Sequence, residues 1–277
     1  MNKLKTLVAG IALVFSAGGA NAALLDGGID LTAGDGELFV SVHNYTKGLT
    51  YHRDLGVTVS GFLAVADDTQ SFFSLFAGDT NWSSFLGQAA TGDVVRFNVA
   101  GNKNATNSVA GVGDTLLLST NQAAPVIAPG AYRDAQQVVL NHVNGMNVDY
   151  GEPVANNLAQ AGINKSAFGD NAALDGYHLE DGWGAQLNPG TTFNTEADFG
   201  VDLAMWAFSV QQVGSGRGAT FNPLSELLAG VWKLSAEGLS YNAETTAPVP
   251  VPAAVWLMGS ALLGLVGVGA RRNRADA

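Results

Sequence analysis

The sequence predicts an all-β fold, a β-sandwich of jelly-roll type that carries a short helical insertion. In several short stretches apolar residues alternate with polar ones, which is the period of a half-buried strand. Glycine is abundant, with 35 residues, and it falls mostly between these stretches, where turns require it. No internal repeat of about 20 to 50 residues is present, which argues against a solenoid or a propeller.

The expected strands follow one another along most of the chain. The first covers residues 37–43 and has three apolar residues on one face, with Ser41 and His43 on the other. The stretch 201–211 is apolar on both faces around Trp206 and Phe208, which is typical of a central sandwich strand. Further strands are expected at 57–65, 93–100 and 116–119, and a closing hairpin joins 231–234 to 239–241.

The middle of the chain departs from the β pattern. After Asp134, which fits a helix N-cap, apolar residues recur at helical spacing as far as Met146. Pro153 fits the first turn of a second helical segment, which Gly162 ends. The sequence from 168 to 199 is rich in glycine, asparagine and aspartate, and it predicts a long loop.

Residues 1–22 are expected to form a secretory signal peptide. Lys3 and Lys5 precede an apolar run, and the pattern Ala20-Asn21-Ala22 then places cleavage by signal peptidase before Ala23. The exported domain would cover residues 23–246. It contains no cysteine, so its stability must come from its core and not from disulfides.

The chain is acidic, with a formal net charge of −11. The exported part is more acidic than the whole chain, because several of the basic residues lie in the two terminal segments. A negative surface disfavours nucleic acid and anionic lipid as partners. It suits an acidic extracellular surface, and it also suits divalent cations.

The C-terminal end combines three segments in a fixed order: a proline-rich segment at 247–252, an uncharged apolar stretch at 253–270 and a basic tail at 271–277. The apolar stretch is just long enough to cross a bilayer, which needs roughly 20 residues as a helix. Arg271, Arg272 and Arg274 should remain on the cytoplasmic side. The alternating prolines favour an extended segment that a membrane peptidase could read. A plain membrane anchor is the alternative interpretation.

The motif Val249-Pro250-Val251-Pro252-Ala253, with the apolar stretch and the arginine cluster after it, resembles the PEP-CTERM class of bacterial sorting signals. The most similar variant is VPLPA-CTERM, in which a leucine takes the place of Val251. The resemblance implies a Gram-negative origin, a precursor tethered to the inner membrane, and processing by an exosortase near the proline motif. It also implies a surface or extracellular-matrix protein, connected with exopolysaccharide and biofilm, that is not an enzyme.

The segment 36–57 resembles the start of the uncharacterised exported β domains that often precede this tail, and no known activity accompanies that resemblance. A search for catalytic motifs agrees, since there is no Gly-x-Ser-x-Gly elbow and no phosphate-binding loop. His43, His52, His142 and His178 have no metal-binding spacing. His43 and His52 could still face each other across a hairpin. No catalytic residue and no cofactor is therefore expected.

Acidic residues leave a calcium-stabilised adhesion domain open as an alternative. Calcium takes several oxygen ligands from loops rich in glycine and aspartate. Such residues cluster near the start of the exported domain, at Asp26, Asp30, Asp35 and Glu37. A second acidic group lies in the long loop, at Asp170, Asp175, Glu180 and Asp181. Neither group matches the Asp-x-Asp-x-Asp-Gly calcium loop.

Carbohydrate binding is the other alternative. Indole and phenol rings stack on sugars, and the loop Asp181-Gly182-Trp183-Gly184 presents such a ring with a carboxylate beside it. Trp183, Tyr177 and Asp181 are the candidate glycan-binding residues. A glycoside-active enzyme would need two carboxylates flanking the scissile bond, and one sequence does not single out such a pair.

Overall fold

The computed structural model describes residues 24, 25, 27, 34–66, 72–105, 113–120, 129–151, 165–170, 195–215, 217 and 219–243. The chain divides at Ala243, and every described residue lies in the unit that ends there. The expected signal peptide, proline-rich segment, membrane span and basic tail lie outside the described residues, so their assignment remains a prediction.

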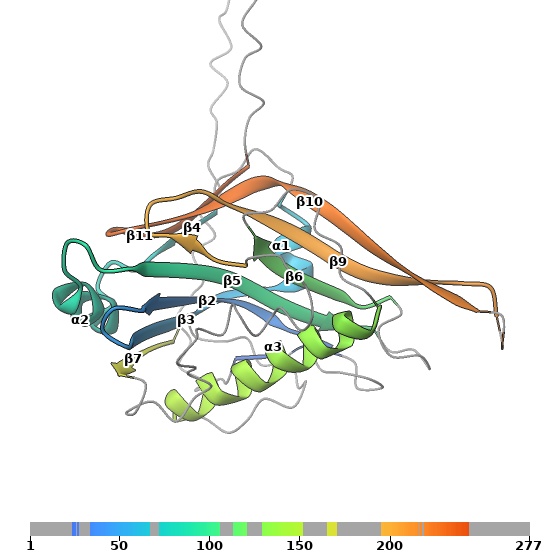
Figure 1. The fold of residues 1–277 in the computed structure, drawn as a ribbon, viewed down its shortest axis with the longest axis horizontal. Helices are drawn as coiled ribbons and strands as arrows, with labels where there is room; N and C mark the ends of the chain where they lie inside the picture. Colours follow the sequence, from blue (N-terminus) through green and yellow to red (C-terminus); the bar gives the residue numbers. More distant parts are fainter. Residues whose placement is uncertain are drawn as a thin grey trace, which may run out of the picture. The chain divides into compact units, whose positions relative to one another are not determined.

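The described residues form one 11-stranded antiparallel sheet and three helices (Figure 1). The sheet has the strand order β4-β11-β10-β9-β6-β5-β2-β3-β7, and the short strands β1 and β8 both pair with β5. The strands are β1 (Gly34–Asp35), β2 (Glu37–Asn44), β3 (Leu49–Thr58), β4 (Phe72–Leu75), β5 (Val95–Asn104), β6 (Thr115–Thr120), β7 (Ser166–Asp170), β8 (Ala197–Asp198), β9 (Leu203–Val213), β10 (Thr220–Ser235) and β11 (Gly238–Ala243). The helices are α1 (Val59–Leu63), α2 (Thr80–Gln88) and α3 (Pro129–Asp149).

The sheet is curled, so that strands near its two ends share one inner core. Tyr51 of β3 packs against Phe76, which directly follows β4, with the two ring centroids 5.4 Å apart. β3 and β4 lie near opposite ends of the strand order. On the same inner face Phe62 of α1 stacks on Trp232 of β10 at 5.5 Å. Aromatic rings from both ends of the sheet therefore close the concave side.

Helix α3 covers the outer face of the sheet (Figure 1). One stripe of the helix is buried against strands β2, β5, β6 and β9; it consists of Tyr132, Ala135, Val139, Val143 and Met146. The N-terminal end of the described chain joins this layer, because Leu24 is fully buried. Its backbone N–H donates to the Asn147 side chain at 2.7 Å, and its carbonyl accepts from the same amide at 3.0 Å.

The expectation of an all-β fold is confirmed in its coarser form, a predominantly β architecture with a helical insertion. The strands expected at 37–43, 116–119 and 201–211 correspond to β2, β6 and β9, and the closing hairpin corresponds to β10 and β11. The strand expected at 93–100 begins at Val95 and continues to Asn104. The sequence identified these elements by alternation of apolar and polar residues or, in 201–211, by apolar residues on both faces.

Two expectations were wrong. Residues 57–65 do not continue as a strand, because Thr58 ends β3 and caps α1 by accepting a hydrogen bond from the Gly61 N–H at 3.1 Å. Helix α3 begins at Pro129, so Asp134 lies inside it and is not its N-cap. Proline suits a first helical turn, which explains the earlier start. The stretch 168–199, expected to be mostly loop, contains the end of β7 and all of β8, and residues 171–194 lie outside the described residues. The expected helical segment at 153–162 lies outside the described residues.

Asp79 connects α2 to the sheet. As the N-cap of α2, its Oδ1 accepts from the backbone N–H groups of Asn81 at 2.9 Å and Trp82 at 3.2 Å. Its Oδ2 accepts from the Tyr51 hydroxyl at 2.9 Å and pairs with Arg53 at 2.5 Å. Ser166 of β7 also donates to Oδ1, at 2.9 Å. One buried carboxylate thereby holds α2, β3 and β7 together.

This network determines the charge of the Asp79 carboxyl. Burial alone would raise its pKa, but the hydrogen bonds from Ser166, Tyr51 and the Trp82 N–H, together with Arg53, lower it below the ordinary value of 3.8. A carboxyl whose pKa is lowered by folding stabilises the folded state at pH values above its unfolded pKa. The contribution is lost as the pH falls through the folded pKa.

We expect Asp79→Ala to lower the free energy of unfolding by about 2–4 kcal/mol, because it removes a helix cap and leaves a buried hydroxyl and a guanidinium without their acceptor. Urea denaturation of the full chain, followed by tryptophan fluorescence, measures the loss. Asp202→Ala is the matched control, since Asp202 is 56% exposed in its 3.3 Å pair with Lys233. The control should change the free energy by less than about 0.5 kcal/mol. Equal losses of unfolding free energy in the two variants would show that Asp79 does not hold α2, β3 and β7 together.

Candidate functional site

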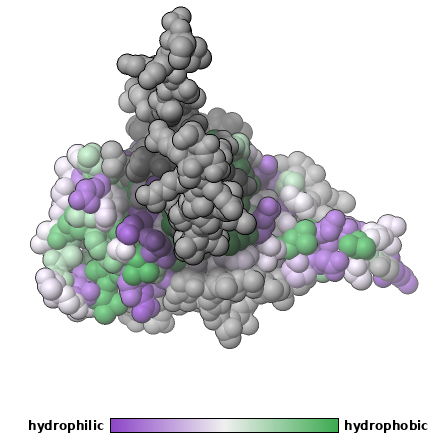
Figure 2. All heavy atoms as spheres, turned by 90° about the horizontal axis from the view of Figure 1, so that it is seen from above, coloured by the Kyte–Doolittle hydropathy of each residue, from purple (hydrophilic) through white to green (hydrophobic). Residues whose placement is uncertain are grey.

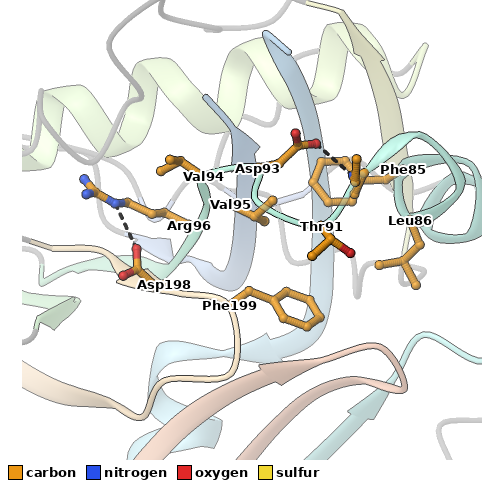
Figure 3. A pocket seen from close by; sticks show the side chains of 11 residues that line it. Phe85, Leu86, Thr91, Asp93, Val94, Val95, Arg96, Asp198 and Phe199 are labelled. Carbon is orange, nitrogen blue, oxygen red and sulfur yellow. Dashed lines mark hydrogen bonds and ion pairs between the residues drawn. The ribbon is translucent and has the colours of Figure 1, made fainter. Parts of the chain in front are cut away.

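A cavity of about 670 Å³ opens beside the C-terminal end of α2 (Figure 3). It lies between α2, the turn that leads into β5, and the turn that follows β8. Its volume falls within the range of roughly 300–1,000 Å³ that is usual for small-ligand sites. The lining residues are Phe85, Leu86, Ala89, Ala90, Thr91, Asp93, Val94, Val95, Arg96, Asp198 and Phe199.

Most of the wall is apolar. Phe85 is fully buried and anchors α2 in the inner core, whereas Phe199 is 39% exposed and presents its ring at the opening. In Figure 3 the Phe199 ring, the Leu86 side chain and the Thr91 hydroxyl surround the same space. A ligand in this cavity would therefore meet an aromatic face with one hydroxyl beside it.

The turn that carries Thr91 is held by Asp93. The Asp93 Oδ2 accepts from the Ala90 N–H at 2.9 Å and from the Asn44 side-chain amide at 2.7 Å. These two hydrogen bonds, of which the one from Asn44 has the larger effect, lower the pKa of Asp93. Gly92 has a φ of 96°, in the left-handed region that glycine adopts without strain. The Asp93 carboxylate thus stabilises the turn, and Thr91 on the same turn is exposed.

The other end of the cavity is charged. The Arg96 Nε donates to the Asp198 Oδ1 at 3.1 Å, and the guanidinium lies 5.7 Å from the centre of the Tyr45 ring. The Tyr45 hydroxyl donates to Glu196 at 2.8 Å. Burial raises the pKa of Glu196 against the opposing effects of this hydrogen bond and of Arg96. Arg96 and Asp198 therefore offer a donor and an acceptor at one end of an apolar groove.

This arrangement suits an amphipathic ligand. An apolar face of the ligand can rest on Phe199 and Leu86, and its polar groups can reach Thr91, Arg96 and Asp198. The polar groups of the lining are the carboxyls of Asp93 and Asp198, the Thr91 hydroxyl and the Arg96 guanidinium, and all of them can hydrogen-bond to a ligand.

A second group of functional side chains is buried between the outer face of the sheet and α3. The Ser41 hydroxyl lies 2.9 Å from the His142 Nε2, and His43 Nδ1 lies 3.0 Å from the Thr50 hydroxyl. The His52 Nε2 lies 2.9 Å from the Asp149 Oδ2. The His52 and Asp149 side chains are 0% and 1% exposed. Ser41 is also buried, and its contact with His142 connects α3 to β2.

The expected approach of His43 and His52 is only partly correct. Both lie on the same face of the β2–β3 hairpin, but the register pairs Ser41 with His52 and His43 with Thr50. The sequence did not predict that His142 and Asp149 would contact Ser41 and His52, because both belong to a helix about a hundred positions further along the chain. Their spacing of seven on α3 was the available signal, since it puts them on one side of a helix.

Two of the four expected calcium ligands are described, and both accept hydrogen bonds from the backbone. The Asp35 Oδ1 accepts from the Ser60 N–H at 3.0 Å, and the Glu37 Oε2 accepts from the Leu25 N–H at 3.0 Å. Among the described residues, no three histidine, aspartate or glutamate side chains lie close enough together to hold a metal ion. Asp26 and Asp30 lie outside those residues, so the calcium site stays a prediction.

The expected glycan-binding residues Trp183, Tyr177 and Asp181 also lie outside the described residues, as do the signal-cleavage residues, the sorting motif and the three arginines of the tail. Within the part of the chain that the structure describes, no helix combines the length and apolar character needed to cross a membrane. Comparison of the chain with protein-family models, with curated proteins and with solved structures found no match.

Glu37 has a further neighbour in Asp54, which is buried on the adjacent strand β3. Burial raises the pKa of Asp54, and repulsion from Glu37 raises it further, while the Gly56 N–H and Arg53 oppose the shift. A carboxyl whose pKa is raised by folding destabilises the folded state progressively as the pH rises above the unfolded value. The effect vanishes only well below the unfolded pKa of 3.8, where the carboxyl is protonated in both states, and it is still small at pH 4.

We therefore expect Asp54→Asn to stabilise the chain relative to the wild type by an amount that grows from pH 4 to pH 8. The amide keeps an oxygen to accept the Gly56 N–H and removes the buried charge. Urea unfolding at pH 4, 6 and 8 measures the difference. Asp202→Asn, at an exposed position, should show no such trend. A difference that shrinks with rising pH would contradict a raised pKa at Asp54.

Proposed function

We propose that the chain is an exported bacterial surface or extracellular-matrix protein, not an enzyme, whose C-terminal segment is an exosortase sorting signal. The observation that carries the proposal is the order of the tail, in which the motif 249–253, the apolar stretch to 270 and the arginine cluster follow one another. The place of the boundary supports it, because the last described strand, β11, ends at Ala243, four residues before the proline-rich segment starts at Ala247.

The other terminal signal and the composition support the same proposal. A signal peptide ending before Ala23 would direct the chain through the general secretory route and release it by signal peptidase. The apolar stretch would hold the precursor in the inner membrane until the exosortase acts. The acidic, cysteine-free domain would then reach the cell surface or matrix, where exopolysaccharide is the proposed partner and nucleic acid is not.

We also propose that the curled sheet is a sandwich-like scaffold of jelly-roll type. The support is the shared inner core, in which Tyr51 from one end of the strand order meets Phe76 from the other. Two halves of a sheet that face each other across one core resemble the two layers of a sandwich.

Processing can be tested by substituting both prolines of the motif. In cells that contain an exosortase, we expect the intact mass of the secreted wild-type chain to lack the residues after the proline motif. The double variant Pro250→Ala and Pro252→Ala should keep the complete tail and accumulate in the membrane fraction, because the extended segment is lost. Pro223→Ala is the matched control, since this proline lies in β10, and it should be processed as the wild type is. A wild-type product that still ends at Ala277 would rule out processing.

Carbohydrate binding is a second candidate function, and the cavity beside α2 favours it. A pyranose ring has an apolar face that packs on an aromatic ring, and its hydroxyls bond to planar polar side chains. Phe199 offers the ring, while Arg96, Asp198 and Thr91 offer donors and acceptors within the same cavity. This site differs from the one expected around Trp183.

The variant Phe199→Ala tests this candidate. If the cavity binds a saccharide, the substitution should weaken the affinity by roughly five- to tenfold, because it removes the stacking surface. A glycan array identifies the ligand, and calorimetry with the best oligosaccharide measures the affinity. Val201→Ala removes a nearby side chain that is 49% exposed and does not line the cavity, so it should leave binding unchanged. Equal binding by both variants would exclude this cavity as the binding site.

A further inference from the structure

A two-stranded arm extends beyond the rest of the sheet (Figure 1). The arm consists of residues 209–213 of β9 and 220–227 of β10, together with the turn that connects them. β9 pairs with β6 only as far as Phe208, and β10 pairs with β11 only from Gly230 onward. Among the described strands, residues 209–213 and 220–224 therefore pair only with each other. At the base of the arm the Val210 carbonyl also accepts from the Gly113 N–H at 3.3 Å.

The arm concentrates exposed apolar side chains. Four of the eight large apolar residues that are exposed in the described chain belong to it: Val213, Phe221, Leu224 and Leu227. Figure 2 shows apolar residues alternating with polar ones along this extension. Leu227 lies opposite Trp206, on the side of the sheet that faces α3, whereas Leu224 lies opposite Ser209 on the other side. Both faces of the arm thus carry apolar surface.

The arm also presents a backbone edge. Over residues 220–227, the side of β10 that faces away from β9 meets no other strand in the described part of the chain. Such an edge is a template for a further strand. A two-stranded ribbon is marginally stable by itself in water, so apolar residues on both faces and an open edge together indicate that the arm is covered when the protein functions.

We propose that the arm pairs with the arm of a second copy of this chain, the two β10 edges running antiparallel across a two-fold axis. Two identical antiparallel edges complement each other across such an axis. An axis perpendicular to the sheet keeps each face on its own side, so the apolar residues of one arm continue those of the other. The two sheets would join into one.

The charges of the arm favour a second copy over an unrelated partner. Its described charged residues are Arg217, near the turn, and Glu226, near the base. Antiparallel pairing centred near Asn222 brings Arg217 of each copy within one or two residues of Glu226 in the other. The arm is locally neutral within a chain of net charge −11, so it is a surface on which two acidic copies can approach each other.

Pro223 is consistent with a limited assembly. Proline lacks an N–H group and is tolerated at the edge of a sheet, where it discourages unrestricted strand addition. Pairing across a two-fold axis closes the assembly at two copies. Pro223 lies beside that axis and donates no hydrogen bond to the second copy, so the apolar side chains of the arm supply much of the contact. The proposal uses no part of the sorting signal, so the failure of either proposal leaves the other standing.

Cross-linking tests the pairing directly, because the chain has no cysteine of its own. The variant Asn222→Cys places a thiol near the proposed axis, where opposite residues lie about 5 Å apart. The full chain in detergent, treated with a short bismaleimide, should give a covalent dimer. Ser84→Cys, at an exposed position on α2, is the control for copies that meet only because they share a micelle, and it should cross-link at least tenfold less.

The contacts are tested by adding Leu224→Lys and Leu227→Lys to the Asn222→Cys variant. These exposed positions can take lysine without disturbing the core, as thermal denaturation will show, and cross-linking should fall at least tenfold. Adding Val201→Lys, at a similarly exposed position away from the arm, should leave it unchanged. The proposal is overturned if Asn222→Cys cross-links no better than Ser84→Cys, if the two lysines have no effect, or if the thiol couples only to a different protein.

Discussion

The inner core depends on the close approach of Tyr241 to the backbone of β10. A Cβ atom on residue 230 would lie 2.4 Å from the Tyr241 ring, so only glycine fits there. The Tyr241 hydroxyl accepts from the Gly230 N–H at 2.9 Å and donates to the Ala66 carbonyl at 3.2 Å. The ring packs against Phe62 and Trp232, each with a centroid separation of 4.9 Å. One side chain thereby joins β10, β11 and the end of α1.

The same contact lies where β10 changes its role. The register between β9 and β10 shifts between Leu227 and Val231, and Gly230 falls within that shift. On one side of it β10 belongs to the closed core, and on the other side it belongs to the arm. A bulge that bends and twists a strand at this point is a known device for redirecting it. The curl of the sheet and the projection of the arm therefore have a common origin.

The outer face is organised by polar as well as apolar contacts. His142 and Asp149 are two turns apart on one side of α3, and they reach Ser41 and His52 on adjacent strands. Apolar packing alone would let a helix slide along its axis with little change in buried area. Two directional hydrogen bonds, two helical turns apart, fix the position of α3 along its axis. Buried polar groups that are fully hydrogen-bonded specify a unique structure in this way.

The accuracy of the sequence predictions depended on how local the determining contacts are. β2 was predictable because its own alternation reflects burial, and β9 was predictable because its stretch is apolar on both faces. α2 and the outer half of β10 were not, since Trp82 and Phe85 are the only buried residues of α2 and β10 contains Pro223 and many exposed residues. The cavity was not predictable either, because residues 85–96 meet 198–199 only through the pairing of β5 with β8. The proposed sorting signal is a local sequence pattern that needs no tertiary contact, so the sequence alone could suggest it.

The burial of Leu24 bears on the order in which the domain folds. On the proposed secretory route Leu24 would be the second residue of the mature chain, yet its backbone is bonded to Asn147, 123 positions away. Leu25, in contrast, bonds to Glu37, which is only 12 positions away. Contacts as distant in sequence as that of Leu24 with Asn147 form late and slowly. The start of the described chain is therefore fixed in the outer layer only after most of α3 is present.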